Sequence, residues 1–278
     1  MPDDRAPPAP ASKQQLFGIS IDCVGMAGAL QRCREALRTR RTLLIGVVNA
    51  AKIVRLRQDS TLRDAILDCD LVLADGQAVV WASKLLRRPL PERVAGIDLF
   101  EELLALADAE HRSVYLLGAK PDVLRRLENR IAQRWPGVVI AGSRHGYFTD
   151  GEAADVAGEI HQRAPDMLFL GMASPKKEVF LRRFRSMLEV PILHGVGGSF
   201  DVLAGMTMRA PPAWQRAGME WAYRLLQEPG RMWRRYLVTN SAFIAMTLRE
   251  AVWPSPLLER GALSYPAVDN MTTGPSTK

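Results

Sequence analysis

Short apolar runs alternate with longer amphipathic stretches along most of the chain. The short runs have the continuous apolar character of strands buried on both faces, and the longer stretches have the spacing of amphipathic helices. The expected strands cover Leu16–Ile21, Thr42–Val48, Leu71–Ala74, Ser113–Leu117, Val138–Ala141, Met167–Leu170 and Pro191–Val196. The expected helices cover Met26–Thr39, Ser60–Asp68, Gln77–Arg87, Ile97–Glu110, Pro121–Trp135, Glu152–Arg163 and Pro175–Leu188.

The alternation of strands and helices continues to Gly205 and then stops. Strands that alternate with helices of about 10–15 residues predict a mostly parallel sheet with helices on both faces. We therefore expect a Rossmann-like α/β catalytic domain over residues 13–205 and a basic, amphipathic helical appendage over residues 206–250. The ends, residues 1–12 and 251–278, are rich in Pro, Ser and Thr and are expected to be disordered tails.

Composition indicates in which cellular compartment the protein is expected. The three cysteines, Cys23, Cys33 and Cys69, are odd in number and lack motif spacing, which argues against a disulfide framework and fits a reducing environment. The polar, Pro-rich N-terminus is not expected to be a signal peptide. No apolar run approaches the roughly 18–20 residues that a membrane-spanning helix needs. The sequence therefore predicts a cytoplasmic protein.

Candidate chemistry begins where the expected strands end. Asn49 closes one strand, and Asp75 with Gly76 closes the next, at the edge where open α/β sheets place their ligands. Arg93 follows Asp75 by 18 residues, in a loop that leads into a helix. A carboxylate and a guanidinium in such loops suggest a base and an anion clamp. A helix-capping aspartate and a surface arginine would explain the same residues equally well.

Three further strand exits are rich in glycine and lead into helices. Helix N-termini that converge on one sheet edge form an anion site, and a nucleoside diphosphate is its natural occupant. Any one of these loops could simply separate a strand from a helix, but three of them with lysines favour a phosphate ligand. Their candidate binding residues are Gly118, Lys177, Gly197, Gly198 and Asp201.

Motifs for metals and cofactors are weak or absent. Asp68 and Asp70 match the DxD pattern that holds a divalent metal in many sugar-nucleotide enzymes, but they precede a strand and would lie at the wrong edge of the sheet. The four histidines are scattered singly, without the spacing of zinc ligands. The patterns GxSxG and GxxxxGK[ST] are absent, and no GxGxxG follows the first strand. We therefore expect neither a metal ion nor a cofactor.

The appendage carries most of the charge asymmetry. Residues 206–250 hold seven arginines and three glutamates, and four of the six tryptophans lie between residues 214 and 253. Trp214, Ala217, Trp221 and Leu225 have the spacing of one helix face. A basic helix with tryptophans suits the surface of an anionic membrane. An ordinary terminal helix packed on the core or on a partner subunit remains an alternative. Nucleic-acid binding is less favoured, because the pattern matches no established nucleic-acid-binding module.

Six segments together resemble one protein family in their order and spacing. They are Val48–Ala50, Ala74–Gly76, Glu92–Asp98, Gly171–Glu178, Gly195–Asp201 and Glu228–Tyr236. Over roughly residues 15–245 the chain resembles the WecG/TagA/CpsF family of bacterial glycosyltransferases. The resemblance implies an inverting, metal-independent transfer from a UDP-sugar to a sugar on polyprenyl diphosphate, at the cytoplasmic face of the membrane. Members make enterobacterial common antigen, teichoic-acid linkage units and exopolysaccharide repeat units.

The resemblance also implies roles for single residues. Asp75 matches the general base that has been proposed for the family, and Arg93 matches the residue thought to contact the donor diphosphate. The appendage arginines thought to engage the lipid diphosphate, or to close over the site, correspond to Arg224, Arg231 and Arg234. Two positions depart from the family pattern, since Val47 replaces a usual threonine and Lys177 a usual glutamine. These departures leave the donor sugar open.

Two other functions compete with this interpretation. A non-catalytic scaffold at the membrane surface would use the appendage but would not need Asp75 or Arg93. A nucleotide-dependent oxidoreductase is weakened by the missing glycine fingerprint. The partners expected for the enzyme are a UDP-sugar, a lipid-linked acceptor and the anionic inner membrane surface, with no nucleic acid. A homo-oligomer is left open.

Overall fold

A computed structural model describes residues 12–216, 218–227 and 229–260. Within the C-terminal helices it describes only the backbone of Pro212, Arg216, Arg224, Arg231, Met232, Arg235 and Tyr236. Most of the two predicted tails, residues 1–11 and 261–278, lies outside the described residues.

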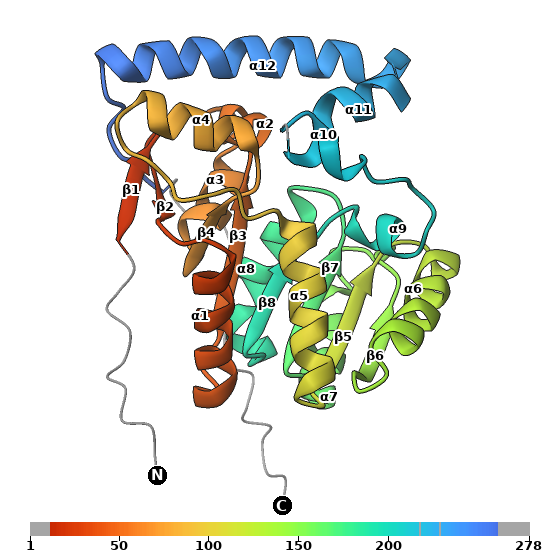
Figure 1. The fold of residues 1–278 in the computed structure, drawn as a ribbon. Helices are drawn as coiled ribbons and strands as arrows, with labels where there is room; N and C mark the ends of the chain where they lie inside the picture. Colours follow the sequence, from red (N-terminus) through yellow and green to blue (C-terminus); the bar gives the residue numbers. More distant parts are fainter. Residues whose placement is uncertain (1–11, 217, 228, 261–278) are drawn as a thin grey trace, which may run out of the picture.

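Six parallel strands form the central sheet, in the order β4-β3-β8-β7-β5-β6 (Figure 1). They are β3 (Leu43–Val48), β4 (Leu71–Ala74), β5 (Ser113–Gly118), β6 (Val139–Arg144), β7 (Met167–Gly171) and β8 (Ile192–Gly195). All four residues of β4 are buried, as expected for a strand that is covered on both faces. The predicted α/β fold is confirmed.

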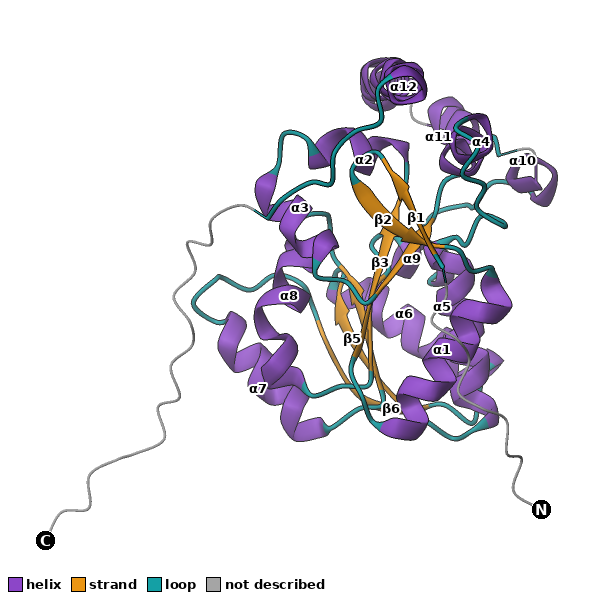
Figure 2. Cartoon of the chain, turned by 90° about the vertical axis from the view of Figure 1, so that its left-hand side faces the viewer, coloured by secondary structure: helices purple, strands orange, loops and turns teal. Residues whose placement is uncertain are grey.

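Helices cover both faces of the sheet (Figure 2). Leu71 and Leu73 pack in one core with α1, α5 and α6, whereas α7 and α8 cover the opposite face. Val72 and Ala74 pack in a third core under α2, α3 and α4. The helices of this region are α1 (Met26–Thr39), α2 (Ala50–Leu56), α3 (Ser60–Leu67), α4 (Gln77–Leu85), α5 (Gly96–Ala109), α6 (Pro121–Arg134), α7 (Ala153–Arg163), α8 (Lys176–Leu188) and α9 (Ser199–Leu203). The sequence did not predict α2 and α9, because seven and five residues are too few to show a helical period.

The first predicted strand, Leu16–Ile21, is wrong. The structure has an antiparallel hairpin there, with β1 (Lys13–Leu16) paired to β2 (Ile19–Asp22), and this hairpin forms a sheet of its own. Phe17 and Gly18 form the two-residue turn, with φ of 56° and 77°. A hairpin turn with two positive φ angles matches the right-handed twist of its strands, so the chain reverses here instead of continuing.

The appendage consists of three helices, α10 (Pro212–Arg216), α11 (Glu220–Gln227) and α12 (Pro229–Val252), which lie across one end of the molecule (Figure 1). The expected common face of Trp214 and Trp221 on one helix is wrong, because Gly218, with φ of 69°, separates α10 from α11. Trp214 instead packs edge-on against Tyr223, with 5.8 Å between the ring centroids.

One side of α12 is anchored to the β1–β2 hairpin. Phe243 is buried against Phe17, with 5.1 Å between the ring centroids, and the Glu250 carboxylate accepts a hydrogen bond from the Phe17 N–H. Beyond α12 the chain returns to the same turn, where the Leu258 N–H donates to the Gly18 carbonyl at 2.7 Å. Among the described helices, including the 24 residues of α12, none qualifies as a membrane span.

Candidate active site

Four neighbouring strands, β4, β3, β8 and β7, bring most of the predicted site residues to one edge of the sheet. Asp75 follows β4, Asn49 follows β3, Gly197 and Gly198 follow β8, and Lys177 lies in the first turn of the helix after β7. Because the strands are parallel, all of these residues lie at the carboxyl edge, where open α/β sheets bind ligands. The predicted clustering of these residues at one sheet edge is therefore present in the structure.

Asp75 is held in place by backbone hydrogen bonds. Its own N–H donates to the Val48 carbonyl at 2.9 Å, and its Oδ1 accepts a hydrogen bond from the Gly96 N–H at 2.8 Å. Gly96 is the first residue of α5, so the carboxylate lies at a helix N-terminus, where negative charge is favoured. Gly76 brings the turn after Asp75 against Asn49, which caps α2 by accepting a hydrogen bond from the Lys52 N–H.

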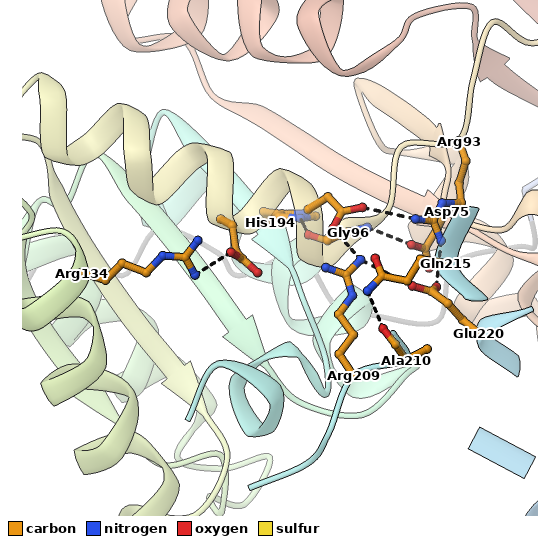
Figure 3. A network of polar contacts seen from close by, with 11 residues as sticks. Asp75, Arg93, Gly96, Arg134, His194, Arg209, Ala210, Gln215 and Glu220 are labelled. Atoms are coloured by element: carbon orange, nitrogen blue, oxygen red, sulfur yellow. Dashed lines mark hydrogen bonds and ion pairs between the residues drawn. The ribbon is translucent and has the colours of Figure 1, made fainter. Parts of the chain in front are cut away.

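The Arg93 guanidinium lies in an ion cluster that joins the α/β domain to the appendage (Figure 3). It contacts Glu220 of α11 at 2.8 Å and Asp98 of α5 at 3.4 Å. Arg209, in the segment before α10, contacts the same two carboxylates. The positive charges of two guanidinium groups and the negative charges of two carboxylates thus balance one another beside Asp75. The sequence motif identified Arg93, but it offered no signal for Glu220, which lies 127 residues away.

Lys177 is buried in a second charged cluster beneath the β8–α9 loop. The ammonium groups of Lys177 and Lys52 contact the same oxygen of Glu178, at 2.7 and 2.8 Å. Burial lowers the pKa of Lys177, and the neighbouring charge of Lys52 adds to that effect. Burial would raise the pKa of Glu178, but the two ammonium groups outweigh it and lower that pKa to about 2. Gly195 leaves room for this lysine, since a Cβ at that position would come within 2.9 Å of Lys177 Cδ.

Two other predicted site residues lie farther along the same edge of the sheet and in the helix that follows β8. Gly118 ends β5, four strand spacings from β4, which at about 4.8 Å per spacing places it roughly 19 Å from Asp75. Asp201 lies in the first turn of α9, and its backbone carbonyl accepts the N–H groups of Met206 and Thr207. Three strand exits do form helix N-termini as expected, and β5, which carries Gly118, is separated from β4 by three other strands of the sheet.

The arginines assigned to the lipid diphosphate lie in α11 and α12. The side chains of Arg224 and Arg231 are outside the described residues. Arg234 is exposed, and its guanidinium lies 5.3 Å from the ring centroid of Trp233.

The DxD pattern lies at the opposite edge of the sheet, as the sequence predicted. The Asp68 carboxylate contacts Arg182 and Arg260, and the Asp70 carboxylate contacts Arg185 at 2.7 Å and the Leu44 N–H at 2.7 Å. These arginines compensate the charges of the two carboxylates. Among the described residues, no three acidic, histidine or cysteine side chains are grouped as a metal ion would require.

Sequence reasoning also missed the residues that surround the predicted base. Lys52 lies in a helix too short to predict, and His194 lies inside an apolar strand, where a lone histidine carries no functional signal. His194 is fully buried, and burial lowers its pKa to about 4, so the ring is neutral near pH 7. Its Nε2 lies 3.1 Å from the Gly96 carbonyl oxygen (Figure 3).

The arrangement places the Asp75 carboxylate, two clusters of paired cations and carboxylates, and helix N-termini around the carboxyl edge. Such a site can accept a proton at Asp75 and can balance the charge of an anionic ligand through the side chains of Arg93 and Lys177.

Comparison with known proteins agrees with this geometry. The family described as "Glycosyl transferase WecG/TagA/CpsF family" matches residues 14–256. The chain is also similar to the N-acetylglucosaminyldiphosphoundecaprenol N-acetyl-beta-D-mannosaminyltransferase of Bacillus spizizenii. The two are 41% identical over 194 residues, which cover 69% of this chain and 74% of that protein. The family match over residues 14–256 spans the sheet, the carboxyl-edge loops and the appendage, and the chain therefore belongs to the WecG/TagA/CpsF family of glycosyltransferases.

Proposed function

We propose that this glycosyltransferase moves a hexose or N-acetylhexosamine from a UDP-sugar to a saccharide carried on polyprenyl diphosphate, with inversion and without a metal ion. The observation that carries the proposal is the Asp75 carboxylate, fixed by the α5 N-terminus at the same edge as Arg93 and Lys177. The name of the Bacillus spizizenii relative describes transfer to a diphosphoundecaprenol-linked acceptor, which supports the acceptor class proposed here.

Asp75 is the proposed general base. Inverting transfer needs one carboxylate to take the proton of the acceptor hydroxyl while the diphosphate leaves from the opposite face of the sugar. Arg93, Lys177 and the helix N-termini would balance the charge of the leaving diphosphate, in the way that a bound metal does in other transferases. Val47 and Lys177 replace the usual family residues near this edge, so the donor sugar needs to be found by experiment.

Donor binding requires a rearrangement of the ion cluster. Arg93 contacts Glu220 and Asp98 in the structure, and a diphosphate needs the same guanidinium. We infer that the diphosphate displaces Glu220 from Arg93, which would release α11 from its contact with the catalytic domain.

The outer face of the appendage supports a role at the anionic inner membrane surface. Exposed apolar side chains extend along it and onto α4: Trp81, Leu85, Trp221, Leu226, Trp233, Leu237, Val238, Ile244, Leu248 and Val252. Arg234 and Arg249 are exposed among them, which suits anionic headgroups. In this proposal the cytoplasmic enzyme binds the membrane peripherally, and Arg224, Arg231 and Arg234 contact the lipid diphosphate.

A screen of UDP-sugars with synthetic polyprenyl-diphosphate-linked saccharides tests the function. We expect one donor and acceptor pair to give UDP and an extended lipid-linked product, and Asp75→Asn to abolish nearly all of that product. Product formation by the Asp75→Asn variant at the wild-type rate would favour a non-catalytic role for the site.

A further inference from the structure

His194 has a fully buried ring in the middle of the sheet, next to the candidate site. It lies on β8, and its ring packs edge-on against Phe169 of β7, with 6.5 Å between the centroids. Its Nδ1 has no hydrogen-bond partner within the described part of the chain. An apolar side chain of similar size would fill this position without burying an unpaired nitrogen, so the polar ring needs a further explanation.

The other ring nitrogen supplies that explanation. Nε2 lies 3.1 Å from the Gly96 carbonyl oxygen, which can only accept a hydrogen bond, so Nε2 carries the proton. Neutral imidazole has one N–H, and Nδ1 is therefore the unprotonated nitrogen. Burial lowers the pKa of His194 to about 4, which keeps the ring in this neutral form at the pH of the cytoplasm.

Gly96 links the histidine to the candidate base. Its carbonyl accepts the hydrogen bond from His194, and its N–H donates to Asp75 Oδ1 at 2.8 Å. Gly96 is also the first residue of α5, where the backbone has fewer intrahelical hydrogen bonds to hold it. The position of this one residue therefore sets the direction of the Asp75 carboxylate, and His194 is the side chain that fixes it from inside the sheet.

We propose that His194 is a positioning residue for Asp75, which it orients through the two hydrogen bonds of Gly96. This proposal rests on the proposed function of Asp75 as the general base. His194 does not touch the substrate and does not exchange a proton during the reaction. Small displacements of a catalytic group cost turnover more than binding, so the loss of His194 lowers kcat and leaves donor binding in place.

Two variants of similar size separate positioning from packing. The amide nitrogen of His194→Gln can reach the place of Nε2 and donate to Gly96, whereas His194→Met fills the space without a donor. We expect His194→Met to lower kcat about 10-fold or more and His194→Gln to stay within about 3-fold of wild type, with the KM for the donor changed less than about 2-fold in both. Leu193→Met, a buried neighbour on β8 that packs on the opposite face, is the control for disturbing this strand.

The Asp75→Asn background gives a second readout. If His194 acts through Asp75, His194→Met causes no further loss of the residual turnover there. Equal losses of kcat in the Gln and Met variants, or the same loss from His194→Met with and without Asp75, would overturn the proposal.

A readout without activity separates this proposal from the proposed function. In ¹⁵N-histidine-labelled protein at pH 7.5, with the His194 signals assigned by their disappearance in His194→Gln, we expect a neutral ring protonated at Nε2. A ring protonated at Nδ1 or at both nitrogens would overturn the proposed positioning of Asp75 through Gly96, even if no variant could be assayed. Failure of the wild-type protein to transfer any tested sugar, with the Nε2 tautomer present, would instead count against the proposed function.

Discussion

Replacing Glu220 by glutamine is expected to tighten the binding of UDP. The change removes the carboxylate that contacts Arg93 at 2.8 Å and Arg209 at 3.5 Å, and leaves Asp98 as their remaining partner. If the donor diphosphate takes the place of Glu220, the free protein loses a competitor for its own binding residue. The affinity for UDP then rises by the free energy of the broken ion pairs.

The exposure of the pair sets the size of this effect. The Arg93 side chain is 14% exposed and that of Glu220 is 29% exposed, so the pair lies between a surface salt bridge and a buried one. Exposed pairs contribute about 0.2–1 kcal/mol, and two guanidinium contacts in a half-buried site justify about 1–2 kcal/mol. Since 1.36 kcal/mol corresponds to a factor of 10, Glu220→Gln should lower the Kd for UDP by about 5- to 30-fold.

Isothermal titration calorimetry with UDP at low ionic strength measures the change. Glu102→Gln is the matched control, because it alters the net charge equally at an exposed position of α5. A second check is limited trypsin digestion, in which UDP should speed the cleavage of residues 206–227 in the wild-type protein. An unchanged or weaker affinity for UDP in Glu220→Gln would refute displacement and would mean that Glu220 instead orients Arg93 for the donor.

Four further outcomes test the site and the appendage. Asp75→Asn should cut turnover by about 10²–10⁴-fold with little change in UDP affinity, and a wild-type rate would remove Asp75 as the base. Turnover should survive excess EDTA; loss on chelation with recovery in Mn²⁺ or Mg²⁺ would make the mechanism metal-dependent. Changing Arg224, Arg231 and Arg234 together to Glu should reduce sedimentation with anionic vesicles and also activity on a water-soluble acceptor, and full activity on that acceptor would leave only a membrane role. The pKa of His194 falls from 6.5 to about 4 on folding, so the unfolded chain binds a proton that the folded protein does not, and stability should drop by about 2–3 kcal/mol between pH 6.5 and 4.5. Urea unfolding should show this drop in the wild type and not in His194→Gln, and equal drops in both would exclude His194 as its source.

The sequence alone was sufficient for the fold class and for the edge of the sheet that carries the chemistry. Hydrophobic runs such as Leu71–Ala74 mark buried strands because burial on both faces demands continuous apolar side chains. Polar residues that end such strands share one edge because parallel strands all point the same way, so the positions of Asp75 and Asn49 along the chain already imply that they lie at the same edge of the sheet. The order and spacing of the motifs were likewise sufficient to identify the family.

Local sequence patterns carry no sign of which residues complete the site, because the partners are far apart along the chain. The order β4-β3-β8-β7-β5-β6 depends on long-range pairing, and it moves Gly118 away from Asp75 while it brings His194 beneath Gly96. The contact of Glu220 with Arg93 depends on the break at Gly218, where α10 ends and the chain changes direction before α11. Local patterns encode which face of a helix or strand is buried. The tertiary structure alone decides which charged side chains meet, because hydrogen bonds and ion pairs form between the side chains that the packing of helices and strands brings together.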